Sequence, residues 1–480
     1  MFHVEQIDGE ALKTAPCDLE WNCFMCLYVA LQRMKMQPHF SWSWVLQQVT
    51  QTIDIWNRSA VPSKLGGLRY TFKEQQTREC AYDEGQQAIE QELKRASRTK
   101  AERFETQERI VAAFARFSTT ALGLEKDATS LLTDGFLPAG TEFARRARRF
   151  DPNLNRSDII QACRSAWTAC GLQPLLGDPM EITPSILGYS LLYPYSDNYL
   201  DRGDVSAEDK LRFSERFRER LRGLRLPAMD HREDALWSLV GLIEEQYPRS
   251  RYPQVFDCLL AIHQAQEESI AQLGAFGHPP DAEVLRITGA KGGASVLADA
   301  CLAHGWLSEE ESRFSFEWGV LLQLGDDLQD VREDLLRGSE TVFSRAAASG
   351  STLDPLVIQL LNFSERVAAG MDNLPNASTT LKDLLRMSWR SLIVGAIADS
   401  HELFSPGFLV EVEHLSPFRF DFLRKRRKRL TSRQGLFVTL FDTFLEAPEH
   451  EDVQVPLPAS RKHSCLLSEA GSAAALATIG

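Results

Sequence analysis

The sequence has few of the signals that mark β-strands. It contains no alternating Val, Ile and Thr runs joined by Asn-Gly or Asp-Gly turns, the pattern that predicts hairpins. No apolar run approaches the roughly 20 residues that a membrane-spanning helix needs. The first residues include Glu5, Asp8 and Glu10, where a secretory signal would carry lysine or arginine. These absences predict an all-α, soluble protein without a signal peptide, which we expect to be cytoplasmic.

Motifs of several enzyme classes are also missing. There is no Gly-x-Ser-x-Gly, no P-loop and no dinucleotide-binding glycine pattern, and the histidines lack the spacing of metal ligands. The nine cysteines are scattered, and Cys23 and Cys26 form a Cys-x-x-Cys pair without a second pair at zinc-finger spacing. We interpret the cysteines as reduced, buried helix residues, with a zinc or redox site at Cys23 and Cys26 as the alternative.

The charge balance argues against nucleic acid as the main partner. Lysine and arginine number 53 and aspartate and glutamate 66, a formal net charge of −13, whereas nucleic-acid-binding surfaces are basic. One basic run, Arg-Lys-Arg-Arg-Lys-Arg at 424–429, interrupts this acidic chain. It is interpreted as a solvated helix face, with guidance of diphosphates, peripheral contact with anionic lipid or contact with another protein as alternatives. The oligomeric state is not predicted.

Helical periodicity and helix-capping residues occupy most of the chain. Thr183 before Pro184 predicts an N-cap followed by proline at the first helical position, and Ser206 with Asp209 predicts another helix start. Residues 84–117 are expected to form one long helix or a broken pair. Further helices are expected at 156–171, 184–202, 207–222, 232–246, 252–275, 281–303, 308–337, 353–370 and 378–399.

An acidic motif at 326–334 carries the most information. Leu321, Leu324, Leu328, Val331 and Leu335 step by three and four residues and predict one buried helix stripe. On a different face lies a column of carboxylates at intervals of four residues, made by Asp326, Asp330 and Asp334, with Asp327 beside it. Like charges at this spacing repel, and oxygen ligands of one sign are what Mg²⁺ needs. A solvated acidic face is the alternative.

A second acidic group lies at the expected end of the helix that precedes Gly203. Asp197 and Asp201 are four residues apart, and Asn198 follows the first of them. The last turn of a helix is an unfavourable place for negative charge, because the helix dipole prefers cations there. Taken alone the group could be a surface turn, but two such motifs on two long helices favour a shared metal site.

These two motifs resemble those of the class I isoprenoid synthases, the helical superfamily of prenyl diphosphate synthases, squalene and phytoene synthases and terpene cyclases. Asp326-Asp327-x-x-Asp330 is similar to their second DDxxD motif, and Asp326, Asp330 and Asp334 also fit the +4/+8 metal triad of terpene cyclases. Asp197-Asn198-x-x-Asp201 is similar to the first motif, with asparagine replacing its second aspartate. The context of that motif looks most like bacterial large-terpene or tetraprenyl-curcumene-synthase-type enzymes.

The resemblance covers about residues 138–350 and implies an antiparallel helix bundle around a central apolar cavity. It implies an N-terminal helical region at 1–100, a catalytic domain at 101–445 and, from composition, a disordered tail at 446–480. It implies that Asp197 and Asp201 bind Mg²⁺ from one wall, and that Asp326, Asp327, Asp330 and Asp334 bind it from the other. The expected substrate is a prenyl diphosphate.

Basic residues are needed on the other side of a diphosphate. Lys291 is the first candidate, because Gly292 and Gly293 are expected to break the helix and free backbone N–H groups for a phosphate. Arg345 and Arg164 are further candidates. Aromatic residues near the motifs could stabilise a carbocation, although core packing is the simpler interpretation: Tyr193, Tyr195, Tyr199, Phe316 and Trp318.

The predicted function is therefore Mg²⁺-dependent ionisation of an allylic prenyl diphosphate, followed by cyclisation or condensation of the carbocation. A chain-elongating prenyltransferase that uses isopentenyl diphosphate is one alternative, although the missing carboxylate at Asn198 weakens it. A non-catalytic helical protein with a degenerate site is the other.

Overall fold

The computed structural model describes residues 38–61, 65–94, 99–200, 202–269, 280–374, 376 and 378–432. The chain divides into two units, residues 1–38 and 39–480, and all described helices belong to the second. No described residue lies in a strand, which confirms the all-α prediction. Within these ranges, no helix is both long and apolar enough to cross a membrane. Cys23, Cys26, Asp201 and the tail at 446–480 lie outside the described residues.

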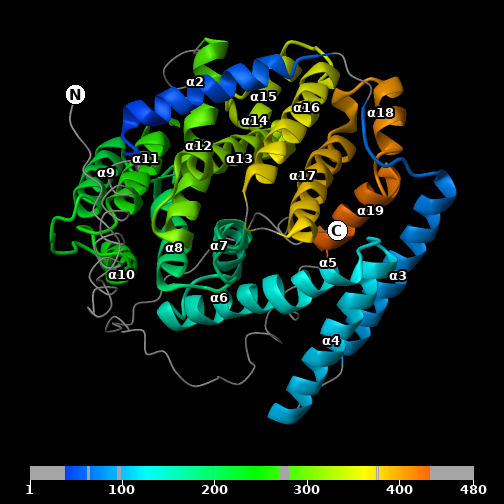
Figure 1. The fold of residues 1–480 in the computed structure, drawn as a ribbon, viewed down its shortest axis with the longest axis horizontal. Helices are drawn as coiled ribbons and strands as arrows, with labels where there is room; N and C mark the ends of the chain where they lie inside the picture. Colours follow the sequence, from blue (N-terminus) through cyan, green and yellow to red (C-terminus); the bar gives the residue numbers. More distant parts are fainter. Residues whose placement is uncertain are drawn as a thin grey trace, which may run out of the picture. The chain divides into compact units, whose positions relative to one another are not determined.

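The helices follow one another along the chain as shown in Figure 1. In order they are α2 (Trp42–Arg58), α3 (Phe72–Leu93), α4 (Lys100–Thr120), α5 (Lys126–Ser130), the π-helix η1 (Leu131–Phe136), α6 (Leu137–Phe150), α7 (Arg156–Leu176), α8 (Pro184–Leu200), α9 (Ala207–Leu221), α10 (His231–Gln246), α11 (Pro253–Ser269), α12 (Asp281–His304), α13 (Glu309–Gln329), α14 (Val331–Arg337), α15 (Val342–Ala348), α16 (Asp354–Gly370), the 3-10 helix η3 (Met371–Asn373), α17 (Thr379–Asp399), the 3-10 helix η4 (His401–Leu403), α18 (Pro406–Glu413) and α19 (Phe420–Ser432).

Both predicted helix starts are confirmed. Helix α8 begins at Pro184, and the Thr183 hydroxyl accepts a hydrogen bond from the backbone N–H of Ile186 at 3.3 Å. The Ser206 hydroxyl caps α9 by accepting from the Asp209 N–H at 3.1 Å. Each cap gives a partner to a backbone N–H that the first turn of a helix leaves unpaired.

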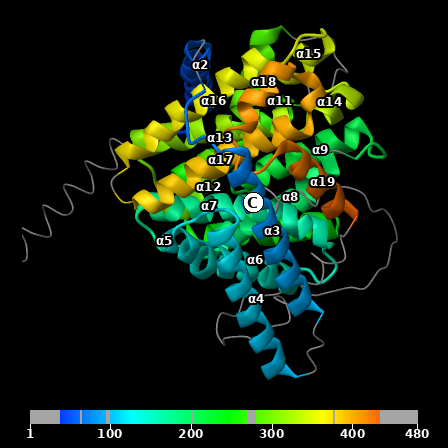
Figure 2. The ribbon, with the colours of Figure 1, turned by 90° about the vertical axis from the view of Figure 1, so that its right-hand side faces the viewer.

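The segment predicted at 84–117 is a broken pair, and both of its helices extend beyond the expected bounds. Thr71 and Glu74 form a capping box at the start of α3, and Thr99 and Glu102 form another at the start of α4. The two helices pack side by side as a hairpin (Figure 2). The capping boxes fix both starts, which the weak amphipathic pattern of these polar helices did not reveal.

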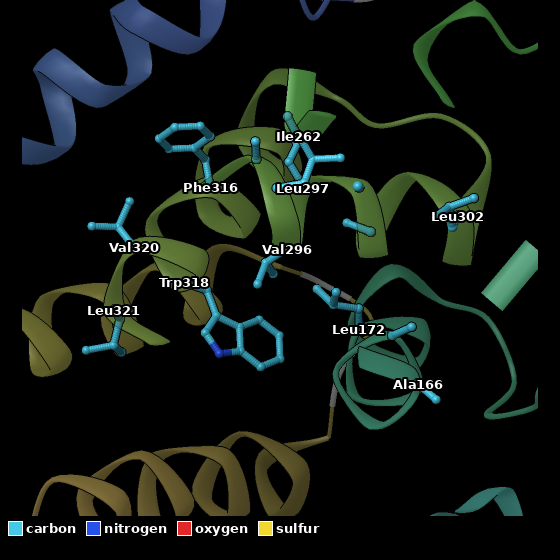
Figure 3. Packing of buried hydrophobic residues seen from close by; sticks show 14 of the residues in the cluster. Ala166, Leu172, Ile262, Val296, Leu297, Leu302, Phe316, Trp318, Val320 and Leu321 are labelled. Atoms are coloured by element: carbon cyan, nitrogen blue, oxygen red, sulfur yellow. The ribbon is translucent and has the colours of Figure 1, made fainter. Parts of the chain in front are cut away.

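Helix α12 lies in the centre of the apolar core. It packs against α13, α11, α7 and α2, and its residues from Val284 to Ala303 are largely buried. Phe316 and Trp318 of α13 lie in this core together with Leu172 and Val296 (Figure 3). Phe316 is 0% and Trp318 3% exposed, so the interpretation of these two aromatic residues as core is confirmed.

The expected helix break at Gly292 and Gly293 is wrong. Helix α12 continues without interruption from Asp281 to His304 and includes both glycines. A Cβ atom on Gly292 would lie 2.5 Å from the carbonyl oxygen of Gly319, and one on Gly293 would overlap the Phe316 ring. The glycines therefore allow close packing of α12 on α13, and this packing offsets their poor helix propensity.

The helix predicted at 308–337 is divided at Asp330. This residue ends α13 and starts α14 with φ −94° and ψ 7°, outside the helical region. Backbone bonds from Asp330 to Asp326 and from Asp334 to Asp330 still follow the four-residue spacing. The helix is thus interrupted at a single residue within the acidic motif, while the four-residue hydrogen-bond spacing continues through it.

The basic run at 424–429 lies on α19 and is only partly solvated. The Arg426 side chain is 8% exposed and lies over the rings of Tyr82 and Phe422, with centroid distances of 4.9 and 5.1 Å. It also forms an ion pair with Asp83 of α3. Part of the run therefore attaches α19 to α3, where a purely solvated face was expected.

Candidate metal and diphosphate site

The acidic motif places a column of carboxylates on α13 and α14. Burial raises the pKa of Asp330, and the neighbouring charge of Asp326 raises it further. Burial, followed by the charge of Asp330, raises the pKa of Asp334 to about 6. These carboxyl groups lie close enough to oppose each other's ionisation, which is the electrostatic condition that a divalent cation would relieve.

Asp327 lies at the contact between α13 and α12. Its carboxyl group accepts hydrogen bonds from the Gln323 amide at 2.9 Å and the Thr288 hydroxyl at 3.3 Å. The side chain is buried, and burial raises its pKa to about 7, against the lowering effect of the Gln323 bond and of nearby Lys291. Asp327 is thus held in a fixed orientation by two hydrogen bonds.

Lys291 is the one predicted basic residue that α12 brings to this contact. Its charge acts on Asp327, and it lies one turn after Thr288 on the same helix. The close approach of Gly292 to α13 explains why the lysine is so near the carboxyl group. The structure therefore brings Lys291 and Asp327 together by helix packing, without the helix break that the sequence suggested.

The two predicted arginines lie in different places. A guanidinium nitrogen of Arg164 on α7 is 2.7 Å from a carboxylate oxygen of Asp326. Arg345 on α15 instead forms ion pairs with Asp281, at 2.5 Å, and with Glu340. Arg164 is thus part of the acidic site as described, whereas a role for Arg345 in diphosphate binding stays a prediction.

The first motif lies at the end of α8, and its described part consists of Asp197 and Asn198. Asp197 accepts hydrogen bonds at 2.9 Å from the hydroxyl of Ser196 and from the amide of Gln266 on α11. The Asn198 amide donates to Asp158 of α7 at 3.1 Å. Asp158 therefore supplies a carboxylate beside Asn198.

The aromatic residues around the first motif have structural partners. The Tyr195 hydroxyl donates to Asp151 at 2.7 Å. The Arg232 guanidinium group lies over the ring of Tyr199, and its central carbon is 3.3 Å from the centroid of that ring. The side chain of Tyr193 lies outside the described residues. These contacts favour the packing interpretation for Tyr195 and Tyr199.

Helix α7 contacts both motifs. Asp158 contacts Asn198 of the first, and Arg164 contacts Asp326 of the second. Arg164 lies six positions after Asp158, which corresponds to about 9 Å along the helix axis. The motifs are therefore held at neighbouring levels of one helix, although Asn198 and Asp326 are 128 positions apart in the sequence.

Several residues of this region were not predicted. Thr288, Gln323, Asp158 and Gln266 each contact a predicted site residue, and the charge of Arg427 on α19 acts on Asp330. Gln323 could have been found from its four-residue spacing to Asp327. The others reach the site from distant elements, so the sequence pattern around the motifs contains no sign of them.

The donor set fits Mg²⁺ in its chemistry, since the candidate ligands are carboxylate oxygens. Among the described residues, no three His, Cys, Asp or Glu side chains converge as a metal site would require. Asp326, Asp330 and Asp334 would have to turn toward a shared ion, and Asp326 would have to leave Arg164. Asp201, outside the described residues, could contribute to the other wall.

Two surface hollows are described, and neither is lined by residues of the acidic motif. One of about 390 Å³ lies between α9 and α11, and one of about 250 Å³ between α13 and α16. Both are lined mainly by charged and polar side chains, so the predicted central apolar cavity stays a prediction.

Comparison of the chain with protein-family models, with curated proteins and with solved structures gives no match.

Proposed function

We propose that this protein is a Mg²⁺-dependent enzyme that ionises an allylic prenyl diphosphate and cyclises or condenses the resulting carbocation. The observation that carries this proposal is the crowding of carboxyl groups at 326–334, with raised pKa values at Asp327, Asp330 and Asp334. Burial, and after it the repulsion between neighbouring carboxyl groups, disfavours the ionised form here, and perturbed groups of this kind cluster at functional sites.

Two basic residues beside these carboxylates support a diphosphate as the substrate group. Arg164 pairs with Asp326, and the charge of Lys291 acts on Asp327. When the carboxylates bind cations, both basic side chains can turn to phosphate oxygens, for which a guanidinium group supplies two parallel donors. Arg164 and Lys291 would thus orient the diphosphate and stabilise the negative charge that grows as it leaves.

The carboxylates have a separate task in this proposal. Mg²⁺, when bound, acts as a Lewis acid on the diphosphate. Asp326, Asp330 and Asp334 would hold the cation, and the hydrogen bonds from Gln323 and Thr288 would keep Asp327 aimed at the contact of α12 and α13. The reaction thus needs little proton transfer from the chain, since the bond that breaks is between carbon and oxygen.

The direct test is release of diphosphate by the purified full-length chain. C10, C15, C20 and longer prenyl diphosphates are supplied with and without Mg²⁺, each with and without isopentenyl diphosphate, and products are identified by mass spectrometry. Mg²⁺-dependent release from one allylic substrate alone supports the proposal. Release only with isopentenyl diphosphate identifies a chain-elongating prenyltransferase, and no release under any condition favours a non-catalytic protein.

Two variants distinguish the site from general acidity. Asp330→Asn removes a carboxylate from the column, and we expect it to lower diphosphate release at least about 100-fold. Glu309→Gln is the matched control, because Glu309 is an exposed carboxylate in the first turn of α13, at the opposite end of the same helix. Equal activity of Asp330→Asn and the wild type would show that the metal assignment is wrong.

A further inference from the structure

A buried hydrogen bond joins α7 to α12 immediately beside the candidate site. The Ser165 hydroxyl donates to a carboxyl oxygen of Asp299 at 2.7 Å, and Asp299 is 3% exposed. The Ser190 hydroxyl of α8 lies 3.4 Å from that of Ser165, so the bond continues to a third helix. Burying a carboxyl group at this depth costs free energy unless the group is hydrogen-bonded, as Asp299 is to Ser165.

The position of Ser165 makes this bond relevant to the site. Its neighbour in the chain, Arg164, forms the ion pair with Asp326 on α13. Consecutive helix residues point about 100° apart, so α7 presents Ser165 toward α12 and Arg164 toward α13. Fixing one of these side chains fixes the rotation of α7 about its axis, and thereby the direction of the other.

Helix α12 is itself held against α13 by the contact of Gly292 with Gly319. The bond between Ser165 and Asp299 therefore places α7 relative to a helix pair that is already fixed. Burial raises the pKa of Asp299 well above its ordinary value, and the hydrogen bond from Ser165 partly opposes this shift.

We propose that Asp299, through Ser165, is a positioning residue that aims Arg164 at the acidic motif and, in the working enzyme, at the substrate diphosphate. The second half of this statement rests on the proposed function. The first half concerns only the geometry of α7 and is independent of any activity. No direct contact between Asp299 and substrate is involved.

The first measurement is the NMR signal of the Arg164 guanidinium group, assigned with Arg164→Lys and with the reference Asp326→Ala, which removes the carboxylate that pairs with Arg164. In Ser165→Ala and Asp299→Leu we expect the signal to move toward its position in Asp326→Ala. Asp299→Asn keeps an acceptor oxygen for Ser165 and should leave the signal at its wild-type position. Ser165→Ala removes a single hydroxyl and serves if Asp299→Leu does not fold.

Thr168→Ala is the matched control, because the Thr168 hydroxyl donates to the Arg164 backbone carbonyl within α7. The proposal is overturned if the signal stays in place in both Ser165→Ala and Asp299→Leu. It is also overturned if Thr168→Ala moves the guanidinium signal equally, or if Asp299→Asn behaves like Asp299→Leu.

The second measurement separates positioning from the proposed function. In Ser165→Ala we expect KM for the prenyl diphosphate to rise about tenfold and kcat to stay within about twofold of the wild-type value. The separate variant Asp299→Asn, which keeps an acceptor for Ser165, should have the wild-type KM. A wild-type protein that releases no diphosphate contradicts the proposed function alone, since the NMR measurement still decides the role of Asp299. An active enzyme with unchanged KM in Ser165→Ala overturns the diphosphate half of the inference.

Discussion

Gly292 of α12 and Gly319 of α13 meet backbone to backbone. A Cβ atom on Gly292 would lie 2.5 Å from the carbonyl oxygen of Gly319, and one on Gly319 would overlap the Gly292 carbonyl. Neither position has room for a side chain, so this crossing requires glycine on both helices. The same crossing brings Thr288 and Lys291 to Asp327, and it is therefore the structural basis of one side of the candidate site.

Gly319→Ala should accordingly lower the free energy of unfolding. The added methyl group forces the helices apart, and overpacking of this kind typically costs about 1–3 kcal/mol. Urea unfolding followed by circular dichroism measures the loss. The separation should also lengthen the bond between Thr288 and Asp327, so any Mg²⁺ binding should weaken in the same variant.

Gly395→Ala in α17 is the control for that experiment, because a Cβ atom there has nothing within 4 Å. It should keep or raise stability, by up to about 1 kcal/mol, since alanine is the better helix former. A Gly319→Ala protein as stable as Gly395→Ala would contradict the described crossing.

Asp327→Asn should change how stability depends on pH. The folded-state pKa of about 7 lies above the usual value for an aspartate, so the folded chain binds a proton more tightly than the unfolded chain. The resulting stabilisation is fully present below pH 4 and is lost as pH rises through 7. The asparagine variant lacks this loss, so from pH 5 to pH 8 the stability of wild type should fall by on the order of 2 kcal/mol more than that of the variant.

Thermal unfolding at pH 5 and pH 8 tests this prediction, with Asp421→Asn as the control. Asp421 is an exposed carboxylate that pairs with Arg424 within α19. A pH dependence that is identical in wild type and Asp327→Asn would show that Asp327 does not titrate with a raised pKa.

Binding of Mg²⁺ should release protons near neutral pH. Asp334 and Asp327, with pKa values of about 6 and about 7, are partly protonated there and must ionise to bind a cation. Calorimetric titration in two buffers of different ionisation enthalpy should show proton release at pH 6.5 and almost none at pH 8.5. The affinity for Mg²⁺ should rise from pH 6.5 to pH 8.5, and Asp330→Asn should abolish Mg²⁺ binding. Release that is independent of pH would exclude these carboxylates as ligands.

Arg426→Ala should detach α19 from α3. The guanidinium group is buried against Tyr82 and Phe422 and pairs with Asp83, so its removal loses both packing and charge. We expect a loss of about 1–3 kcal/mol and faster proteolysis after residue 413. Lys425→Ala changes an exposed neighbour and should have little effect. Equal proteolysis of the two variants would mean that Arg426 does not hold α19.

Strongly periodic helices could be predicted from the sequence, often to within a few residues. Helix α12 was expected at 281–303 and is Asp281–His304, and α17 was expected at 378–399 and is Thr379–Asp399. The helices at 126–150 were not predicted, because Gly135, Pro138 and Gly140 interrupt the periodic pattern there. Tertiary packing, invisible in a local pattern, overrides such breaks, as it does at Gly292.

The candidate site could be predicted only where its members share a helix. The spacing of Asp326, Asp330 and Asp334 is a local property, and the structure keeps these residues in order along α13 and α14. The contacts that give them partners come from α7, α12 and α19, and these depend on the fold. For the same reason the sequence could not show that Arg345 pairs with Asp281, 64 residues earlier.

Helix α7 has a consequence for any relative of this protein. Asp158 contacts one acidic motif and Arg164 the other, so the number of residues between them sets the distance and angle between the two contacts. Inserting or deleting one residue in that interval would turn one contact by about 100° and shift it by about 1.5 Å relative to the other. An Asp-x₅-Arg interval on the helix before the first motif is thus a search signature for related chains.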